Sequence, residues 1–124
     1  ICISVEEARK EQDEWVKTRG KAIERGQGYE DTREFWYSLE ELQEYLDYVR
    51  EKSREQGVEK PGIRIYLGAY PQSNEKKSYS TIFFAPTKEK SKATDEEKSE
   101  DVDENNYEIE PFNDSQGGWP PRSY

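Results

Sequence analysis

The chain has 124 residues, of which 38% are charged and only 31% hydrophobic, and its net charge is −9. This length and composition fit one domain with a modest core, while 13% aromatic residues are too many for a wholly disordered chain. No run approaches the roughly 18 consecutive apolar residues of a membrane span, so we expect a soluble protein. The chain has no histidine and a single cysteine, Cys2. Histidine-dependent catalysis, zinc clusters and paired-cysteine redox chemistry are therefore excluded.

The negative charge is concentrated late in the sequence. Nine acids and one lysine between residues 95 and 110 give a net charge of −8, which leaves −1 for the rest of the chain. A nucleic-acid-binding protein needs a basic surface, so this distribution argues against nucleic acid as a partner. One cysteine gives no intramolecular disulfide, and we favour a cytoplasmic location.

Two helices are predicted. Ser4 and Glu7 form a capping box before an amphipathic pattern that ends at Gly26 and Gly28. Consecutive aromatic residues at 35–37 suggest a short extended piece. A second capping box, Ser38 with Glu41, opens a helix predicted over 39–56.

Two strands follow. Alternating apolar residues in PGIRIYLGAYP (61–71) and a β-branched and aromatic run in YSTIFFAP (79–86) predict an antiparallel hairpin. We expect Ile63, Ile65 and Leu67 to pack on the two helices. The opposite face, with Arg64, Tyr66 and Tyr70, is expected to be covered in part by the returning C-terminal segment.

The sequence therefore predicts a single α+β domain over 1–124, with two amphipathic helices packed on a small antiparallel sheet of 2–4 strands. Its parts are a helical and hairpin body (1–87), a charged linker or acidic loop (88–106) and an aromatic C-terminal segment (107–124). Residues 107–112 are the candidate for a third strand or an extended lid.

Two candidate sites stand out. Arginine and aromatic residues typical of binding hot spots could line a groove: Arg64, Tyr66, Tyr70, Tyr79, Tyr107 and Trp119. Alternatively, these aromatic residues simply form a second small core. Asp101, Asp103 and Asn105 have the spacing of a calcium loop. However, Asn106 and Phe112 replace the glycine and the glutamate that such a loop needs, so we expect an acidic turn and no metal or cofactor.

The runs WYSLEELQEYLDYVREKSREQG, GIRIYLGAYP, TIFFAPT and GGWPP, between Trp36 and Pro121, resemble a family of small uncharacterised bacterial proteins seen mainly in Bacteroidota. The resemblance implies no particular activity. From the residues themselves we expect a non-catalytic protein-interaction module, most concretely an acidic domain of the immunity-protein or inhibitor type. Its acidic segment, with Glu96, Glu97, Asp101 and Asp103, would steer a basic protein partner. The alternative is a small-ligand or carbohydrate binder, or an enzyme, that uses Arg64 and the tyrosines around it.

Overall fold

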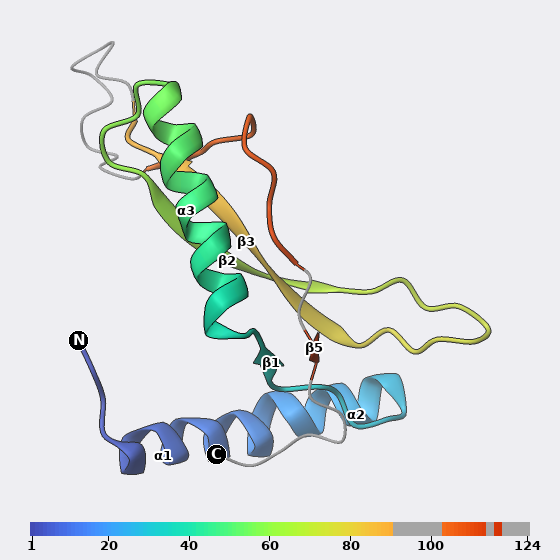
Figure 1. The fold of residues 1–124 in the computed structure, drawn as a ribbon. Coiled ribbons are helices and arrows are strands. Elements are labelled where there is room, and N and C mark those ends of the chain that lie inside the picture. Colours follow the sequence, from blue (N-terminus) through green and yellow to red (C-terminus); the bar gives the residue numbers. More distant parts are fainter. Residues whose placement is uncertain (91–102, 114–115, 118–124) are drawn as a thin grey trace, which may run out of the picture. The chain divides into compact units, whose positions relative to one another are not determined.

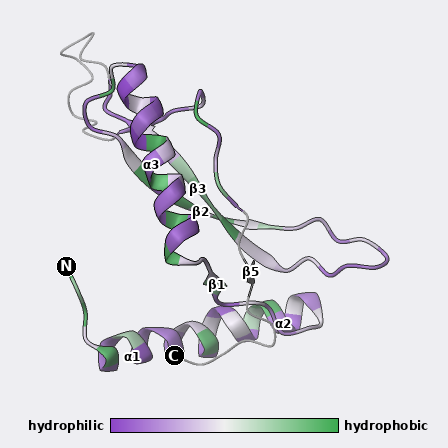
Figure 2. Cartoon of the chain, viewed as in Figure 1, coloured by the Kyte–Doolittle hydropathy of each residue, from purple (hydrophilic) through white to green (hydrophobic). Residues whose placement is uncertain are grey.

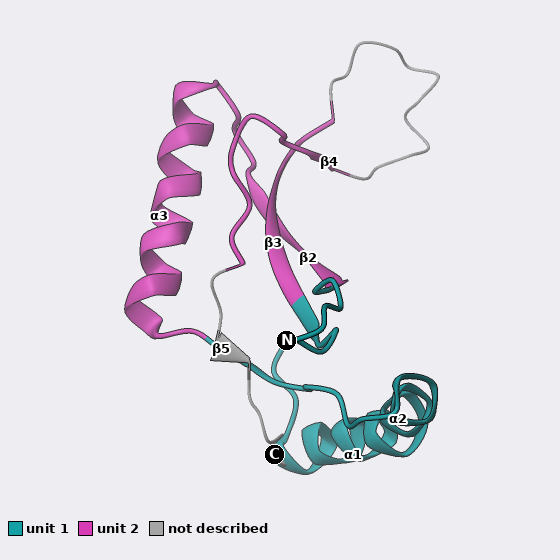
Figure 3. Cartoon of the chain, turned by 90° about the vertical axis from the view of Figure 1, so that its right-hand side faces the viewer, with its two compact units in different colours: residues 1–36, 69–81, 116–124 teal, residues 37–68, 82–115 magenta. Residues whose placement is uncertain are grey.

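A computed structural model describes residues 1–90, 103–113 and 116–117 of the chain (Figure 1). The elements are helices and short antiparallel strands, which confirms the α+β class. The chain divides into two compact units, drawn in different colours in Figure 3. Unit 1 comprises residues 1–36, 69–81 and 116–124, and unit 2 comprises residues 37–68 and 82–115. No helix in the described ranges is long and apolar enough to cross a bilayer.

The N-terminal helical region of unit 1 begins where the sequence predicts. The Ser4 hydroxyl accepts a hydrogen bond from the Glu7 amide at 3.0 Å, and the Glu7 carboxylate accepts one from the Ser4 amide. The region consists of α1 (Val5–Trp15), a π-helical turn η1 (Val16–Gly20) and α2 (Lys21–Gln27). Gly28 ends it with a φ of 85°, a left-handed conformation that glycine adopts without strain.

The π-helical turn was not predicted from the sequence. At its end, Gly20 lies against the indole ring of Trp15, where a Cβ atom would be only 3.2 Å from Trp15 Cζ3. The wider π-helical turn and the absence of a side chain at Gly20 together leave room for the indole ring of Trp15. A propensity pattern shows that a helix forms, but it does not distinguish i to i−5 from i to i−4 pairing.

Short antiparallel contacts and one buried acid hold the rest of unit 1. The expected extended piece is β1 (Phe35–Trp36), which pairs with β5 (Gln116–Gly117). Asp31 is 4% exposed, and its carboxylate accepts hydrogen bonds from both the amide and the hydroxyl of Ser80. A buried carboxylate needs such donors to replace the water it loses.

Helix α3 (Leu39–Glu55) opens unit 2. The hydroxyl of Ser38 caps it by accepting a hydrogen bond from the Glu41 amide at 3.0 Å, and Gly57 follows its end with a φ of 77°. The helix carries hydrophobic and hydrophilic residues in alternating bands (Figure 2). It buries Tyr45, Val49 and Ser53, so the expected amphipathic helix is confirmed.

The sheet of unit 2 has the order β2–β3–β4. Its strands are β2 (Gly62–Ala69), β3 (Ser80–Lys88) and β4 (Glu104–Asn105). The short connection makes β2 and β3 an antiparallel hairpin, and Thr87 pairs with Asn105 in the antiparallel β3–β4 ladder. The third strand therefore lies just before the predicted range 107–112, inside the predicted linker. Phe112 still returns to the sheet, through an isolated bridge to Phe84.

The core of unit 2 lies between α3, β3 and the returning chain. Its buried members are Tyr45, Val49, Phe84 and Ile109, and the partly buried side chains packed on them are Tyr37, Leu42, Ile63, Ile82 and Phe112. The rings of Tyr45 and Phe112 stack with centroids 4.7 Å apart. The Tyr45 hydroxyl donates a hydrogen bond to the Glu110 carbonyl at 2.9 Å, which ties the helix to the returning segment.

One packing prediction was wrong. Ile63 packs on this core, but Ile65 is 61% exposed and Leu67 is 86% exposed. The core beside α3 is completed by Ile109 and Phe112 from the chain after β4, and Ile63 is the one residue of β2 that packs on it.

Candidate functional site

Arg64 connects β2 to the returning segment. One guanidinium nitrogen, Nη1, donates to Asn105 Oδ1 at 2.6 Å, and Nη2 donates to the Asp103 carbonyl at 2.8 Å. The segment 107–124 was expected to cover the Arg64 and Tyr66 face, but the residues that bond to this face, Asp103 and Asn105, belong to the predicted linker (88–106). The bonds from Arg64 have a charged donor, which makes them stronger than bonds between neutral groups.

Tyr66 lies beside this contact. Its ring stacks on Phe83, with centroids 5.2 Å apart and planes 18° from parallel. Its hydroxyl accepts a hydrogen bond from Asn105 Nδ2 at 2.8 Å. That bond, with a second from Arg64, stabilises the phenolate and lowers the pKa of Tyr66 below its usual value.

These residues border a hollow of about 300 Å³ in unit 2, which we call the aromatic hollow. Side chains alternate across a strand, so Phe83 and Ala85 of β3 share one face of the sheet. The wall comes from the returning segment. The full lining is Tyr66, Phe83, Ala85, Pro86, Asn105, Asn106, Tyr107, Ile109 and Pro111.

The wall of the aromatic hollow is held in place by buried groups. Ile109 and Asn106 are each 2% exposed. Asn106 donates to the side-chain oxygen of Gln56 at 2.6 Å and accepts from the Glu108 amide at 3.2 Å. Tyr107, in contrast, is 89% exposed at the rim. A fixed wall with an open aromatic rim is a pre-formed concave surface, as binding sites usually are.

Acidic residues stand next to the residues of this wall in the sequence. Four exposed carboxylates alternate along the chain with the lining residues, each within two positions of one: Asp103, Glu104, Glu108 and Glu110. Two basic side chains, Arg64 and Lys88, also contact this stretch of the chain. Arg64 binds the returning segment, and Lys88 is 3.9 Å from Glu104. The stretch of chain that forms the wall therefore keeps a negative charge.

The structure brings together three of the six predicted binding residues. Arg64, Tyr66 and Tyr107 all contact Asn105. Tyr70 and Tyr79 belong to unit 1, where the Tyr70 hydroxyl accepts from Thr81 and the Tyr79 ring packs edge-on against Tyr29. Trp119 lies outside the described residues.

Sequence reasoning missed Phe83, Asn105 and Asn106 as site residues. Phe83 could have been found, because it alternates with Phe84 in a predicted strand and must face the other side of the sheet. Nothing local marks Asn105, since its partners Arg64 and Tyr66 are distant in the sequence. Its side-chain oxygen, proposed above as a possible calcium ligand, accepts instead from Arg64. Asp101 lies outside the described residues, and within the described part no group of three or more acids or cysteines could hold a metal ion.

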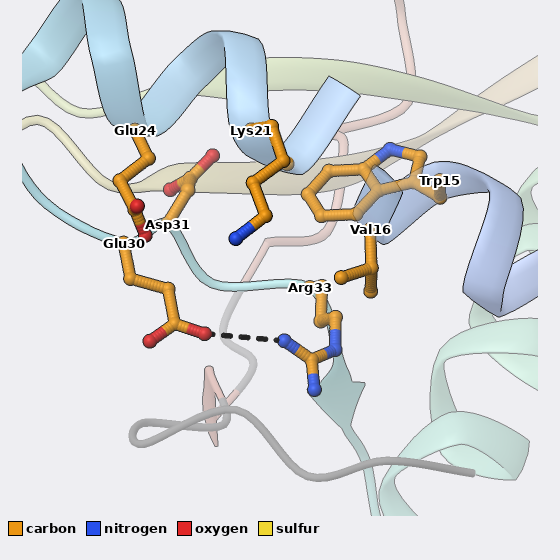
Figure 4. Close-up of a pocket in the computed structure, with 8 residues that line it drawn as sticks. Trp15, Val16, Lys21, Glu24, Glu30, Asp31 and Arg33 are labelled. Atoms are coloured by element: carbon orange, nitrogen blue, oxygen red, sulfur yellow. Dashed lines mark hydrogen bonds and ion pairs between the residues drawn. The ribbon is translucent and has the colours of Figure 1, made fainter. Parts of the chain in front are cut away.

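A second, smaller hollow lies in unit 1 beside the π-helical turn (Figure 4). Its volume is about 40 Å³, with Trp15, Val16 and Gly20 on one side. The charged residues Lys21, Glu24, Glu30, Asp31 and Arg33 complete the lining. Glu30 and Arg33 form an ion pair at 3.4 Å. The space admits only one or a few water molecules and its charges are mixed in sign, so we do not take it as the functional site.

Comparison of the chain with protein-family models, with curated proteins and with solved structures gave no match. The resemblance to bacterial proteins stays a prediction. Function is therefore inferred from the chemistry of the aromatic hollow itself.

Proposed function

We propose that this chain is a non-catalytic protein-interaction module that docks on a basic partner through the aromatic hollow. The observation that carries the proposal is a hollow with an apolar floor and the exposed ring of Tyr107 among its lining residues, in a stretch of chain with four exposed carboxylates. Tyrosine and arginine at a pocket are typical hot-spot residues. The four carboxylates would speed encounter with a positively charged surface.

An immunity protein or inhibitor is the most concrete form of this proposal. Such a protein needs a rigid, acidic docking surface and no chemistry of its own. The steering residues Glu96, Glu97 and Asp101 lie outside the described residues. Asp103, the fourth, is exposed, and so are Glu108 and Glu110, which neighbour lining residues of the aromatic hollow in the sequence.

The proposal is tested by affinity capture from an extract of the organism that encodes the chain, with quantitative mass spectrometry. The immobilised protein should retain a basic partner that is lost with Tyr107→Ala. That residue is nearly fully exposed, so its removal leaves the core intact. A partner retained equally by both proteins would place the binding surface elsewhere and contradict the proposal.

A charge-matched pair of variants tests the carboxylates of Glu108 and Glu110. Glu108→Gln with Glu110→Gln should slow association with the captured partner at low salt, and the difference should shrink at high salt. Glu11→Gln with Glu14→Gln removes the same charge from α1 and should have a smaller effect. Equal effects of the two pairs would mean that the net charge of the protein, and not the position of Glu108 and Glu110, determines the association rate.

A second candidate is favoured by one observation, the stack of Tyr66 on Phe83 beside Arg64 and Asn105. Aromatic faces with amide and guanidinium groups also suit a sugar or another small ligand. Titration with common monosaccharides and oligosaccharides, monitored by tyrosine fluorescence, separates the two candidates. Saturable sugar binding that is lost in Tyr66→Ala would favour the second.

A further inference from the structure

The side-chain groups of the aromatic hollow differ in their hydrogen bonds. Each lining amide oxygen already accepts one bond, whereas the two phenol groups still have a hydrogen to donate. Asn105 Oδ1 accepts from Arg64, and Asn106 Oδ1 accepts from the Glu108 amide. The two phenol groups are the opposite case. Tyr66 Oη and Tyr107 Oη each accept from Asn105 Nδ2, at 2.8 and 3.4 Å.

A phenol that accepts a hydrogen bond still has its own hydrogen to donate. Within the described part of the chain, the hydroxyl hydrogens of Tyr66 and Tyr107 have no hydrogen-bond acceptor. Both hydroxyl groups are therefore positioned by Asn105 with a donor left for a ligand. The aromatic hollow therefore offers a ligand two hydrogen-bond donors and an apolar surface.

A complementary ligand has acceptors for these two donors and apolar rings for the hollow. A proline-rich segment in the polyproline II conformation meets this description. It has no internal hydrogen bonds, so its carbonyl groups are free to accept, and each proline lacks an N–H group. Its rings pack on aromatic side chains, and its stiffness reduces the entropy lost on binding.

The charge around the aromatic hollow adds a second requirement. The carboxylates of Asp103, Glu108 and Glu110 are exposed and make no ion pair within the described part of the chain. They would bind arginine or lysine residues next to the prolines. We propose that the aromatic hollow binds a proline-rich segment flanked by basic residues, presented by the partner protein.

This inference rests on the proposed function and names the chemistry of the partner. It is tested with the full chain and a fluorescently labelled oligoproline peptide with arginine flanks, by fluorescence anisotropy. We expect saturable binding at micromolar concentrations. A peptide with glutamate flanks should bind at least tenfold more weakly, as should an arginine-flanked peptide in which alanine replaces proline.

Variants of the two tyrosines test whether the peptide binds in the aromatic hollow. Tyr66→Phe removes one donor and keeps the ring, and should weaken binding about fivefold, the change expected for one hydrogen bond. Tyr107→Ala, at an exposed position, should weaken it about tenfold or more. Tyr48→Phe, which removes a hydroxyl from α3, is the matched control and should leave the affinity unchanged. Circular dichroism of each variant verifies that the fold is retained.

The outcomes are distinct. Binding of the proline peptide that neither tyrosine variant changes would overturn the inference, as would the absence of saturable binding. If the alanine and proline peptides bind equally and Tyr107→Ala weakens both, the hollow takes basic segments of any backbone. The inference would then be wrong, while the proposed interaction module would stand. The proposed function is judged separately, by the affinity capture from extract. The result with the peptides does not change the outcome of that experiment.

Discussion

Beyond Ile63, the two faces of strand β2 have the opposite exposure to the one that their hydrophobicity suggests. Ile65 and Leu67, on the apolar face, are 61% and 86% exposed. Arg64 and Tyr66, on the polar face, are half-buried and bonded to the returning segment. The comparison teaches that alternation identifies the two faces of a strand, while the rest of the chain decides which face is covered. An edge strand gives the least information, because one of its sides has no neighbour in the sheet.

The largest effect on stability is expected for Ile109→Ala. Ile109 is 2% exposed and belongs to the core that α3 covers. Removal of its side chain should cost about 2–5 kcal/mol of the free energy of unfolding, as for other buried aliphatic residues. Chemical denaturation monitored by circular dichroism measures the loss. A cost below about 0.5 kcal/mol would mean that the returning segment does not complete this core.

Tyr45→Phe tests the bond between the helix and the returning segment. Without the hydroxyl, the Glu110 carbonyl loses its donor, and the cost should be about 1–3 kcal/mol. The same denaturation experiment measures it. Tyr48→Phe, on the same helix and more exposed, should cost less, and the opposite order would contradict the observed packing.

Tyr45 also predicts a pH dependence. Burial, with a smaller contribution from Tyr48, raises the pKa of Tyr45 from its usual value near 10 to about 12. Between these values the unfolded chain has lost this proton and the folded chain has kept it. The free energy of unfolding should therefore fall as the pH rises from 10 to 12. Tyr45→Phe should reduce this slope, with Tyr107→Phe as the control. Equal slopes in wild type and Tyr45→Phe would contradict the pKa shift.

Asn105→Ala tests the polar face. The variant removes the acceptor of Arg64 and the donor to Tyr66, but the bond from Arg64 to the Asp103 carbonyl remains. The cost should be about 1 kcal/mol, and the pKa of Tyr66 should rise towards its usual value. Tyrosine absorbance titration, with Tyr66→Phe subtracted, measures that pKa. An unchanged value would mean that Asn105 does not position the phenol.

The smallest effect is expected on the apolar face. Leu67→Ala should change the free energy of unfolding by less than about 0.5 kcal/mol, because its side chain is exposed. Ile63→Ala, on the same face but packed on the core, is the matched comparison and should cost more. A loss of more than about 2 kcal/mol for Leu67→Ala would show that β2 is covered after all.

The elements governed by local chemistry were predictable from the sequence. The caps at Ser4 and Ser38, the glycine after α2 and the hairpin all follow from neighbouring residues. Packing was not predictable where it depends on distant partners. Nothing near Ile65 indicates that Ile109 will complete the core beside α3. The aromatic hollow was half predictable, since Arg64, Tyr66 and Tyr107 are recognisable by type. Asn105, which connects them, has no local signal.

The contact between Tyr45 and Glu110 spans 65 residues of sequence, and this separation has a consequence for synthesis. On the ribosome, α3 and the hairpin emerge well before Ile109 and Phe112. The side chains of Tyr45 and Phe84 therefore stay exposed until these two residues have been synthesised. Unit 2 must then fold late in translation, or after it. Until that point the nascent chain presents uncovered aromatic surface of the kind that chaperones bind.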